Sequence, residues 1–171
     1  MNHMLAGFGY DIHRLQPGLP LRLGGIDIPD APAGPAAHSD GDVILHATCD
    51  ALLGAAALGD IGRHFPDTDP AYRGINSLEL LHHVMALLAG EGLRPRNVDC
   101  MVVLERPKIA PYREAMRQAM ADAMGLPPER VSVKATTNEG LGPIGAGEGM
   151  AAYAVATVEE ITRDEVRDRR G

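Results

Sequence analysis

The sequence predicts an α/β fold of the α+β kind: a single domain whose mixed sheet is covered by helices on one face. Segments that alternate apolar and polar residues are interleaved with segments whose apolar residues recur every three or four positions. The 171 residues contain no repeat, low-complexity stretch or internal linker. A chain of this length buries about two thirds of the surface of its unfolded state, so it can fold without a disulfide or structural metal.

Two strands are expected near the N-terminus. Residues 7–15 and 21–29 have strand composition, and Pro20 and Pro29 bracket the second segment. Because the two segments follow each other closely along the chain, we expect them to pair as an antiparallel hairpin.

A helix is predicted over residues 42–58. Its apolar residues keep a period near 3.6, and the sequence SDGD at 39–42 supplies a capping signal at its start. The next residues, GDIGRHFPDTDP at 59–70, are rich in glycine, proline and aspartate and predict an exposed loop. Loops of this length are often functional.

The second half of the chain continues the alternation of helices and strands. Amphipathic helices are expected at 77–92 and 111–126, the latter with Pro111 in its first turn. Strands are expected at 97–105, 131–137 and 150–161. The domain should therefore span residues 1–162, and residues 163–171, with their alternating charges, should form a solvated tail.

Composition excludes several classes of function. The net charge of −7 argues against a nucleic-acid surface, which needs clustered Lys and Arg. No apolar run approaches the roughly 18 residues of a membrane span, and the N-terminus lacks an export signal. The two cysteines, Cys49 and Cys100, form no CxxC motif. We expect a cytoplasmic protein with neither a nucleic-acid nor a membrane partner.

Asp11 and His13 lie two apart in a predicted strand, so both side chains leave the same face of the sheet. Taken alone, such a pair usually contacts solvent, or the two side chains contact each other. Metal binding by the pair alone is less common. If His46 joined it, three protein ligands with an open fourth position would describe a catalytic rather than a structural zinc site.

His46 shares one helical face with two carboxylates, because Asp42, His46 and Asp50 are spaced at i, i+4 and i+8. Either carboxylate could accept from the second ring nitrogen of a ligating histidine or face a substrate. The alternative for Asp42, which is favoured when that residue is taken alone, is a carboxylate at a helix N-terminus. The alternative for Asp50 is a polar flank of the helix.

Two segments are candidates for phosphate binding. His38 and Ser39 precede the predicted helix, where free backbone N–H groups favour an anion, although Ser39 could simply cap the helix. Thr136 and Thr137 lead into a glycine-rich loop, where Glu139 could hold Mg²⁺ beside a phosphate. Taken alone, this second segment is better explained as an ordinary strand-to-turn connection.

Four stretches together resemble the 2-C-methyl-D-erythritol 2,4-cyclodiphosphate synthase family. They are GYDIHRL, HSDGDVILHATCDALLGAAALGDIGRHFPDTDP, ERPKIAPY and VKATTNEGLGPIGAGEG, and they occur in the family's order. The resemblance covers nearly the whole chain and leaves out only the charged tail. It implies a homotrimer with sheets around the threefold axis and with three active sites at subunit boundaries.

The resemblance also implies roles for particular residues. The zinc ligands, one ion per subunit, would be Asp11, His13 and His46, and Glu139 would hold magnesium or manganese with the substrate diphosphate. His38 and Thr137 would polarise or orient phosphate. The remaining substrate-binding positions would be Ser39, Asp60, Ile61, Gly62, Phe65, Pro66, Asp67, Thr68, Asp69, Leu104, Glu105, Arg106, Pro107, Lys108, Ile109, Ala110, Thr136 and Asn138.

The implied reaction converts 4-diphosphocytidyl-2-C-methyl-D-erythritol 2-phosphate into the 2,4-cyclodiphosphate and CMP, for isoprenoid precursor synthesis by the non-mevalonate pathway. The nucleophile would be the substrate's own phosphate, which needs no strong base, and none is evident. Catalysis would rest on folding the substrate and on metals that offset charge repulsion. Two alternatives stay open: a zinc-dependent hydrolase of nucleotide diphosphates and a non-catalytic trimeric binder of isoprenoid diphosphates or metal.

Overall fold

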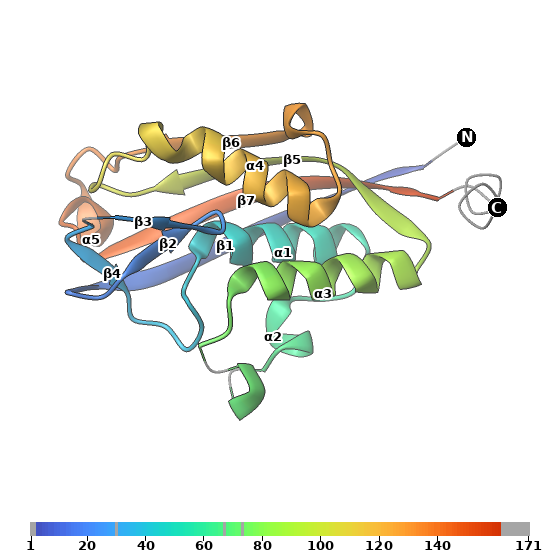
Figure 1. Cartoon of the computed structure of the whole chain (residues 1–171), viewed down its shortest axis with the longest axis horizontal. Coiled ribbons are helices and arrows are strands. Elements are labelled where there is room, and N and C mark those ends of the chain that lie inside the picture. The colour runs from blue at the N-terminus through green and yellow to red at the C-terminus, as the bar shows by residue number, and fades with distance from the viewer. Residues whose placement is uncertain (1–2, 30, 67, 73, 162–171) are drawn as a thin grey trace.

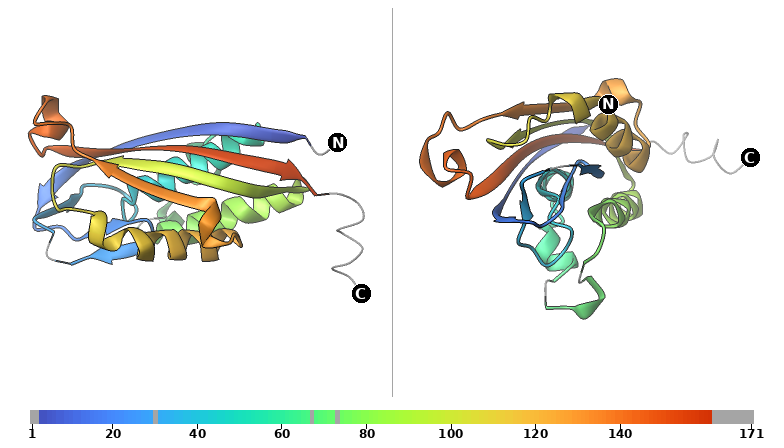
Figure 2. Two further views of the ribbon diagram at one scale, coloured as in Figure 1. Left: turned by 90° about the horizontal axis from the view of Figure 1, so that it is seen from above. Right: turned by 60° about the vertical axis from the view of Figure 1, so that its left-hand side comes forward.

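The computed structural model describes residues 3–29, 31–66, 68–72 and 74–161. A five-stranded mixed sheet in the order β4-β1-β7-β5-β6 carries helices α1, α3 and α4 on one face (Figures 1 and 2). The strands are β1 Met4–Pro17, β2 Leu21–Leu23, β3 Ile26–Ile28, β4 Ala33–Pro35, β5 Leu93–Val103, β6 Val131–Thr136 and β7 Gly149–Glu160. The helices are α1 Val43–Ala55, α2 Ile61–His64, α3 Ser77–Gly90, α4 Arg113–Met124 and α5 Gly142–Gly145, with 3₁₀ turns at Pro70–Tyr72, Ala110–Tyr112 and Pro128–Arg130.

The predicted fold class is confirmed. Among the strand pairs, β5 and β6 are parallel while β1–β4, β1–β7 and β5–β7 are antiparallel, so the sheet is mixed. The expected tail at 163–171 lies outside the described residues. No helix within the described residues is long and apolar enough to cross a membrane.

The predicted N-terminal hairpin is wrong. β1 pairs along most of its length with β7, from Met4 opposite Glu159 to Arg14 opposite Gly149. The segment 21–29 forms a hairpin of its own, with β2 and β3 joined at Gly24 and Gly25. Both glycines have positive φ, 57° and 85°, which suits a tight two-residue turn.

The predicted loop at 59–70 is only partly irregular. Asp60 accepts a hydrogen bond from the backbone N of Arg63 at 2.9 Å and so caps the short helix α2. The side chain of Asp50 accepts from the backbone N of Ile61 at 2.8 Å, which ties the start of α2 to α1. Asp50 and Asp60 therefore fix the start of α2, in a segment whose composition predicted no regular structure.

Helix α1 lies directly against the backbone of β1. A Cβ added at Gly7 would stand 2.0 Å from the carbonyl oxygen of Ala51, and one at Gly9 would stand 1.9 Å from that of Ala47. Real Cβ atoms do not approach an oxygen so closely. The helix therefore lies at this depth only because the two strand positions facing it are glycines.

The start of α1 is fixed by Asp42, which confirms the capping interpretation. Its carboxylate accepts from the backbone N of Leu45 at 3.1 Å and from the N–H groups of Gly24 and Gly25 at 2.9 and 2.7 Å. Burial raises the pKa of Asp42 to about 6, while the three backbone donors act in the opposite direction. The cap thus joins the β2–β3 turn to the first turn of α1.

The other face of the sheet is not covered by the helices of the described chain (Figure 2). Large side chains exposed on β1 and β7 gather there, because alternate residues of a strand point to the same side. They are Met4, Phe8, Tyr10, Ile12, Tyr153 and Val155. An exposed apolar surface of this kind marks an interaction site more often than a free surface.

The contact at Gly9 gives a stability prediction. Gly9→Ala should lower the free energy of unfolding by about 1–3 kcal/mol or more, because α1 must move away from the strand. Gly90→Ala is the matched control, since its Cβ meets nothing within 4 Å, and it should not destabilise the protein. Thermal unfolding at one protein concentration measures both. An unchanged midpoint for Gly9→Ala would show that the helix and strand are not in backbone contact there.

Candidate functional site

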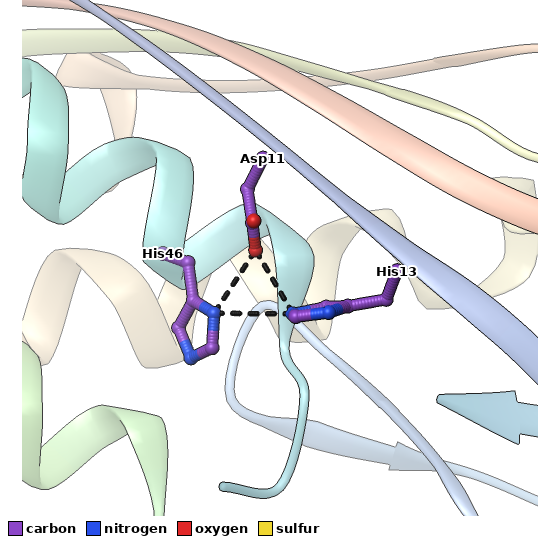
Figure 3. Close-up of side chains that lie close together, drawn as sticks. All are labelled: Asp11, His13 and His46. Atoms are coloured by element: carbon purple, nitrogen blue, oxygen red, sulfur yellow. Dashed lines mark hydrogen bonds and ion pairs between the residues drawn. The ribbon is translucent and has the colours of Figure 1, made fainter. Parts of the chain in front are cut away.

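Asp11, His13 and His46 meet at one point between β1 and α1 (Figure 3). Asp11 Oδ2 lies 3.0 Å from His13 Nε2 and 3.0 Å from His46 Nδ1. The two imidazole nitrogens, His13 Nε2 and His46 Nδ1, are 3.3 Å apart. Three atoms that can each donate a lone pair therefore point at a common centre.

The local structure explains why these residues meet. Asp11 and His13 continue the face of β1 that carries Gly7 and Gly9 and is turned towards α1. His46 lies in the first turn of α1, just after the cap at Asp42, so its position is set by the same cap. The site therefore depends on the depth at which the helix meets the strand.

Burial and charge act against each other in this cluster. Burial by itself raises the pKa of Asp11, but hydrogen bonds from His13 and His46 lower it to about 2. Burial by itself lowers the pKa of His46, but the hydrogen bond and negative charge of Asp11 outweigh it and raise that pKa. The carboxylate thus attracts positive charge into a buried site.

The three atoms fit a divalent metal such as zinc. Zinc bonds to histidine nitrogen and carboxylate oxygen are about 2.0–2.2 Å long, so two ligands of a tetrahedron stand about 3.3–3.5 Å apart. The observed separations of 3.0, 3.0 and 3.3 Å are close to these values. Three ligands define one face of a tetrahedron and leave the fourth position for water or a substrate oxygen.

The second ring nitrogen of His46 has serine partners. Its Nε2 lies 2.9 Å from Ser77 Oγ and 3.2 Å from Ser39 Oγ. Neither Asp42 nor Asp50 is among these partners: Asp42 caps the helix, and Asp50 accepts from the backbone N of Ile61. The alternative in which one of these carboxylates accepts from His46 is therefore wrong, and for Asp42 the helix-terminus alternative is confirmed.

A cavity of about 510 Å³ opens beside the cluster. Eight of the residues predicted for the site line it: His13, His38, Ser39, His46, Ile61, Gly62, Phe65 and Pro66. Four further residues line the cavity but were not predicted from the sequence: Ala37, Tyr72, Ile75 and Leu80. Tyr72 packs edge-on against Phe65, with ring centroids 5.5 Å apart. Two residues therefore build the aromatic wall of the cavity, and only Phe65 belongs to a sequence motif.

Of the other predicted residues of this loop, Asp60, Thr68 and Asp69 are not among the described residues that line the cavity. Asp60 caps α2, and Thr68 is exposed. The backbone N of Asp69 bonds to the carbonyl oxygen of Pro66, which closes the turn after α2. Asp67 lies outside the described residues.

A second, smaller cavity of about 190 Å³ lies at the ends of β5 and β6. Because these strands are parallel, with Val103 opposite Thr136, the segments that follow them are neighbours. The predicted residues lining this cavity are Leu104, Glu105, Pro107, Lys108, Ile109, Ala110, Thr136 and Thr137. Arg106 lines a different hollow, beside Leu15 and Ala146.

The loop after β6 is held by Glu105. The carboxylate of Glu105 accepts from the backbone N of Asn138 at 2.6 Å, and Asn138 Nδ2 donates to the carbonyl oxygen of Leu141 at 2.7 Å. Thr137 Oγ1 donates to Glu139 Oε1 at 3.3 Å, and Glu139 is exposed. Asn138, predicted to bind substrate, thus has a clear structural role in this loop.

The metal-type cluster and the second cavity are separate in this chain. The two cavities share no lining residue. One is lined by two of the three candidate metal ligands, His13 and His46, and the other is lined by Thr136, Thr137 and Lys108. A ligand that contacts both sets of residues therefore cannot be bound within a single one of these cavities.

Comparisons with known proteins give a consistent assignment. The model of the YgbB family matches residues 4–159. A protein of Symbiobacterium thermophilum named 2-C-methyl-D-erythritol 2,4-cyclodiphosphate synthase is 62% identical over 155 residues, which cover 91% of this chain and 98% of that protein.

Two solved structures are also similar. The CDP-bound form of a 2C-methyl-D-erythritol-2,4-cyclodiphosphate synthase has a TM-score of 0.83 at 42% identity and covers 90% of this chain and 99% of that one. The bifunctional IspDF of Campylobacter jejuni has a TM-score of 0.89 at 39% identity over 94% of this chain. This chain covers only 43% of IspDF, so it corresponds to less than half of that protein.

The cluster predicts how the protein responds to loss of one ligand. His46→Ala should reduce zinc binding by more than about 100-fold yet leave the fold intact, because alanine suits a helix and the core does not depend on the metal. His82→Ala, an exposed histidine on α3, is the matched control and should bind zinc normally. Metal content after dialysis and circular dichroism measure the two effects. Unfolding of the normal chain by a chelator would show instead that the metal is structural.

Proposed function

The chain belongs to the YgbB family, and from that premise we propose that it is a 2-C-methyl-D-erythritol 2,4-cyclodiphosphate synthase. Its substrate is then 4-diphosphocytidyl-2-C-methyl-D-erythritol 2-phosphate. The observation that carries the proposal is the cluster of Asp11, His13 and His46, which opens onto a cavity large enough for part of a nucleotide substrate. The relatives with this name match the chain over nearly its whole length.

The reaction is an internal displacement at phosphorus. An oxygen of the 2-phosphate attacks the β-phosphorus, which is the one linked to the erythritol oxygen. The bond from that phosphorus to the oxygen bridging it to the α-phosphorus breaks, and CMP leaves with this oxygen. No water and no redox partner are consumed. The nucleophile is already anionic, so the residues need to fold the substrate and limit charge repulsion.

The metal half of the site is assigned to β1, α1 and the segment before α1. Asp11, His13 and His46 would hold zinc, which when bound supplies a Lewis acid and a template for phosphate oxygens. His38 and Ser39 line the same cavity and would donate hydrogen bonds to phosphate. Ile61, Gly62, Phe65 and Pro66 would surround the erythritol unit and exclude water from it.

The nucleotide half is assigned to the ends of β5 and β6. Residues 104–110 would bind the cytidine, and Thr136 and Thr137 would donate to the diphosphate. Glu139, exposed beside Thr137, would hold magnesium or manganese bound to the diphosphate. A solved relative described as CDP-bound supports a nucleotide ligand of this kind.

We also propose that the active enzyme is a homotrimer with sites at subunit boundaries. Two observations support this assembly: the two halves of the site share no lining residue within one chain, and the sheet face away from the helices exposes large apolar side chains. Sheets that pack by these faces around a threefold axis would bury the apolar side chains and bring unlike halves together. A cytoplasmic location remains a prediction; Cys49 and Cys100 are both free and buried, as suits a reducing compartment.

Product analysis tests the proposed function. With zinc and magnesium present, phosphorus NMR should show one cyclic diphosphate formed together with CMP in equal amounts. Water activated by the same metal would give two linear phosphates instead. Linear products would establish the hydrolase alternative, and an unchanged substrate would favour the non-catalytic binder.

Mixed assemblies test the shared site. His46→Ala and Thr137→Ala subunits should each be inactive alone but recover part of the activity when mixed, because some boundaries then carry two intact halves. His46→Ala mixed with Asp11→Ala is the control and should recover nothing, since both changes damage the metal half. Equal inactivity of the two verified mixtures would place the whole site within one subunit.

A further inference from the structure

A chain of hydrogen bonds leads from His46 into the protein, away from the cavity. Ser77 is the first residue of α3, is fully buried, and lies 2.9 Å from His46 Nε2 through its Oγ. The helix does not need this hydroxyl for its own start, because Asn76 caps α3 by accepting from the backbone N of Leu78. The hydroxyl of Ser77 is therefore available for a role towards His46.

The carboxylate of Asp40 sets the direction of this chain. It accepts from the hydroxyl of Ser77 through a short hydrogen bond, from the backbone N of Ser77 at 2.9 Å and from the backbone N of Asp42 at 3.2 Å. A carboxylate that receives three donors acts only as an acceptor. The hydroxyl proton of Ser77 is consequently committed to Asp40, and its oxygen is left to accept.

We infer that Asp40 and Ser77 are positioning residues that hold the His46 ring for a metal at Nδ1. Because Ser77 Oγ can only accept from the ring, Nε2 of His46 carries a proton. Nδ1 faces the cluster, 3.0 Å from Asp11 Oδ2 and 3.3 Å from His13 Nε2, and without a metal it shares a proton with the Asp11 carboxylate. A metal that replaced this proton would find the other ring proton held on Nε2 by Ser77, so that the lone pair of Nδ1 is left for the metal.

The same direction governs Ser39. Its Oγ accepts from the backbone N of Gly41 at 3.1 Å and lies 3.2 Å from the protonated Nε2 of His46. Both neighbours are donors, so the hydroxyl proton of Ser39 must point elsewhere. Ser39 lines the cavity, and its proton is therefore free for a phosphate oxygen there. Asp40 and Ser77 thus orient both the candidate metal ligand His46 and the hydrogen-bond donor Ser39.

This inference rests on the proposed metal site, but its tests need no substrate. Long-range proton–nitrogen correlation spectra of the zinc-loaded full chain, labelled in its histidine rings, distinguish a proton on Nε2 from one on Nδ1. The wild-type protein should show His46 with its proton on Nε2.

Substitutions then test the two positioning residues. Ser77→Ala should change the Nε2–H signal of His46 and weaken zinc binding about 10–100-fold, the usual effect of losing a hydrogen-bond partner behind a metal ligand. Asp40→Asn should have a similar effect, because an amide N–H₂ then faces one of the groups that now donate to the carboxylate. Ser77→Thr keeps the hydroxyl and should preserve both the Nε2–H signal and the zinc affinity.

The control removes a buried hydroxyl on α1, the helix that carries His46. Thr48 donates to the carbonyl oxygen of Ile44, so Thr48→Val should change neither the ring spectrum nor the zinc affinity. A wild-type His46 with its proton on Nδ1 would overturn the inference, as would a Ser77→Ala protein with an unchanged spectrum and affinity. A protein that shows the expected spectrum but makes no cyclic product would refute only the proposed function.

Discussion

The backbones of α1 and β1 approach each other closely, and the position of the metal-type cluster follows from this contact. Added side chains at Gly7 and Gly9 would stand 2.0 and 1.9 Å from carbonyl oxygens of the helix, so the helix can lie here only against glycine. The next two residues on the same face of the strand are Asp11 and His13. The depth that the glycines allow is therefore the depth at which His46 reaches both side chains.

The cluster combines a buried position with a strong preference for positive charge. Burial alone would raise the pKa of Asp11 and lower that of His46, yet their mutual contact moves each pKa the other way. A divalent cation at the centre would satisfy the same carboxylate and both imidazoles. Outside this centre, serines rather than carboxylates contact His46, and the charge of Asp40 is one hydroxyl group further away.

Local signals predicted much of this fold. Hydrophobic periodicity located α1, α3 and α4, and the SDGD segment contained the actual cap, Asp42. Strand pairing was predicted less well, because β1 pairs with β7, about 140 residues away, and no local signal encodes that choice. The sequence shows two adjacent glycines at the Gly24–Gly25 turn, but they fall in the middle of the strand predicted over residues 21–29.

The metal-type cluster was predicted because spacing brought Asp11 and His13 to one face and family resemblance added His46. Ser77 was not predicted, because it lies 31 residues from His46 and looks like any other serine at the start of a helix. Tyr72 was missed for a similar reason: it closes the cavity by packing against Phe65, and packing across a loop leaves no motif. The separation of the two cavities could not be predicted either, because it depends on how distant segments of the chain are arranged in space.

We propose that α1 and β1 together build a metal centre from three side chains. Diffraction from crystals of the zinc-loaded protein, measured on both sides of the zinc absorption edge, locates the metal. One anomalous peak per chain is expected at bonding distance, about 2.0–2.2 Å, from Asp11 Oδ2, His13 Nε2 and His46 Nδ1. A peak bound to other residues, or no peak at this cluster in fully loaded protein, would contradict it.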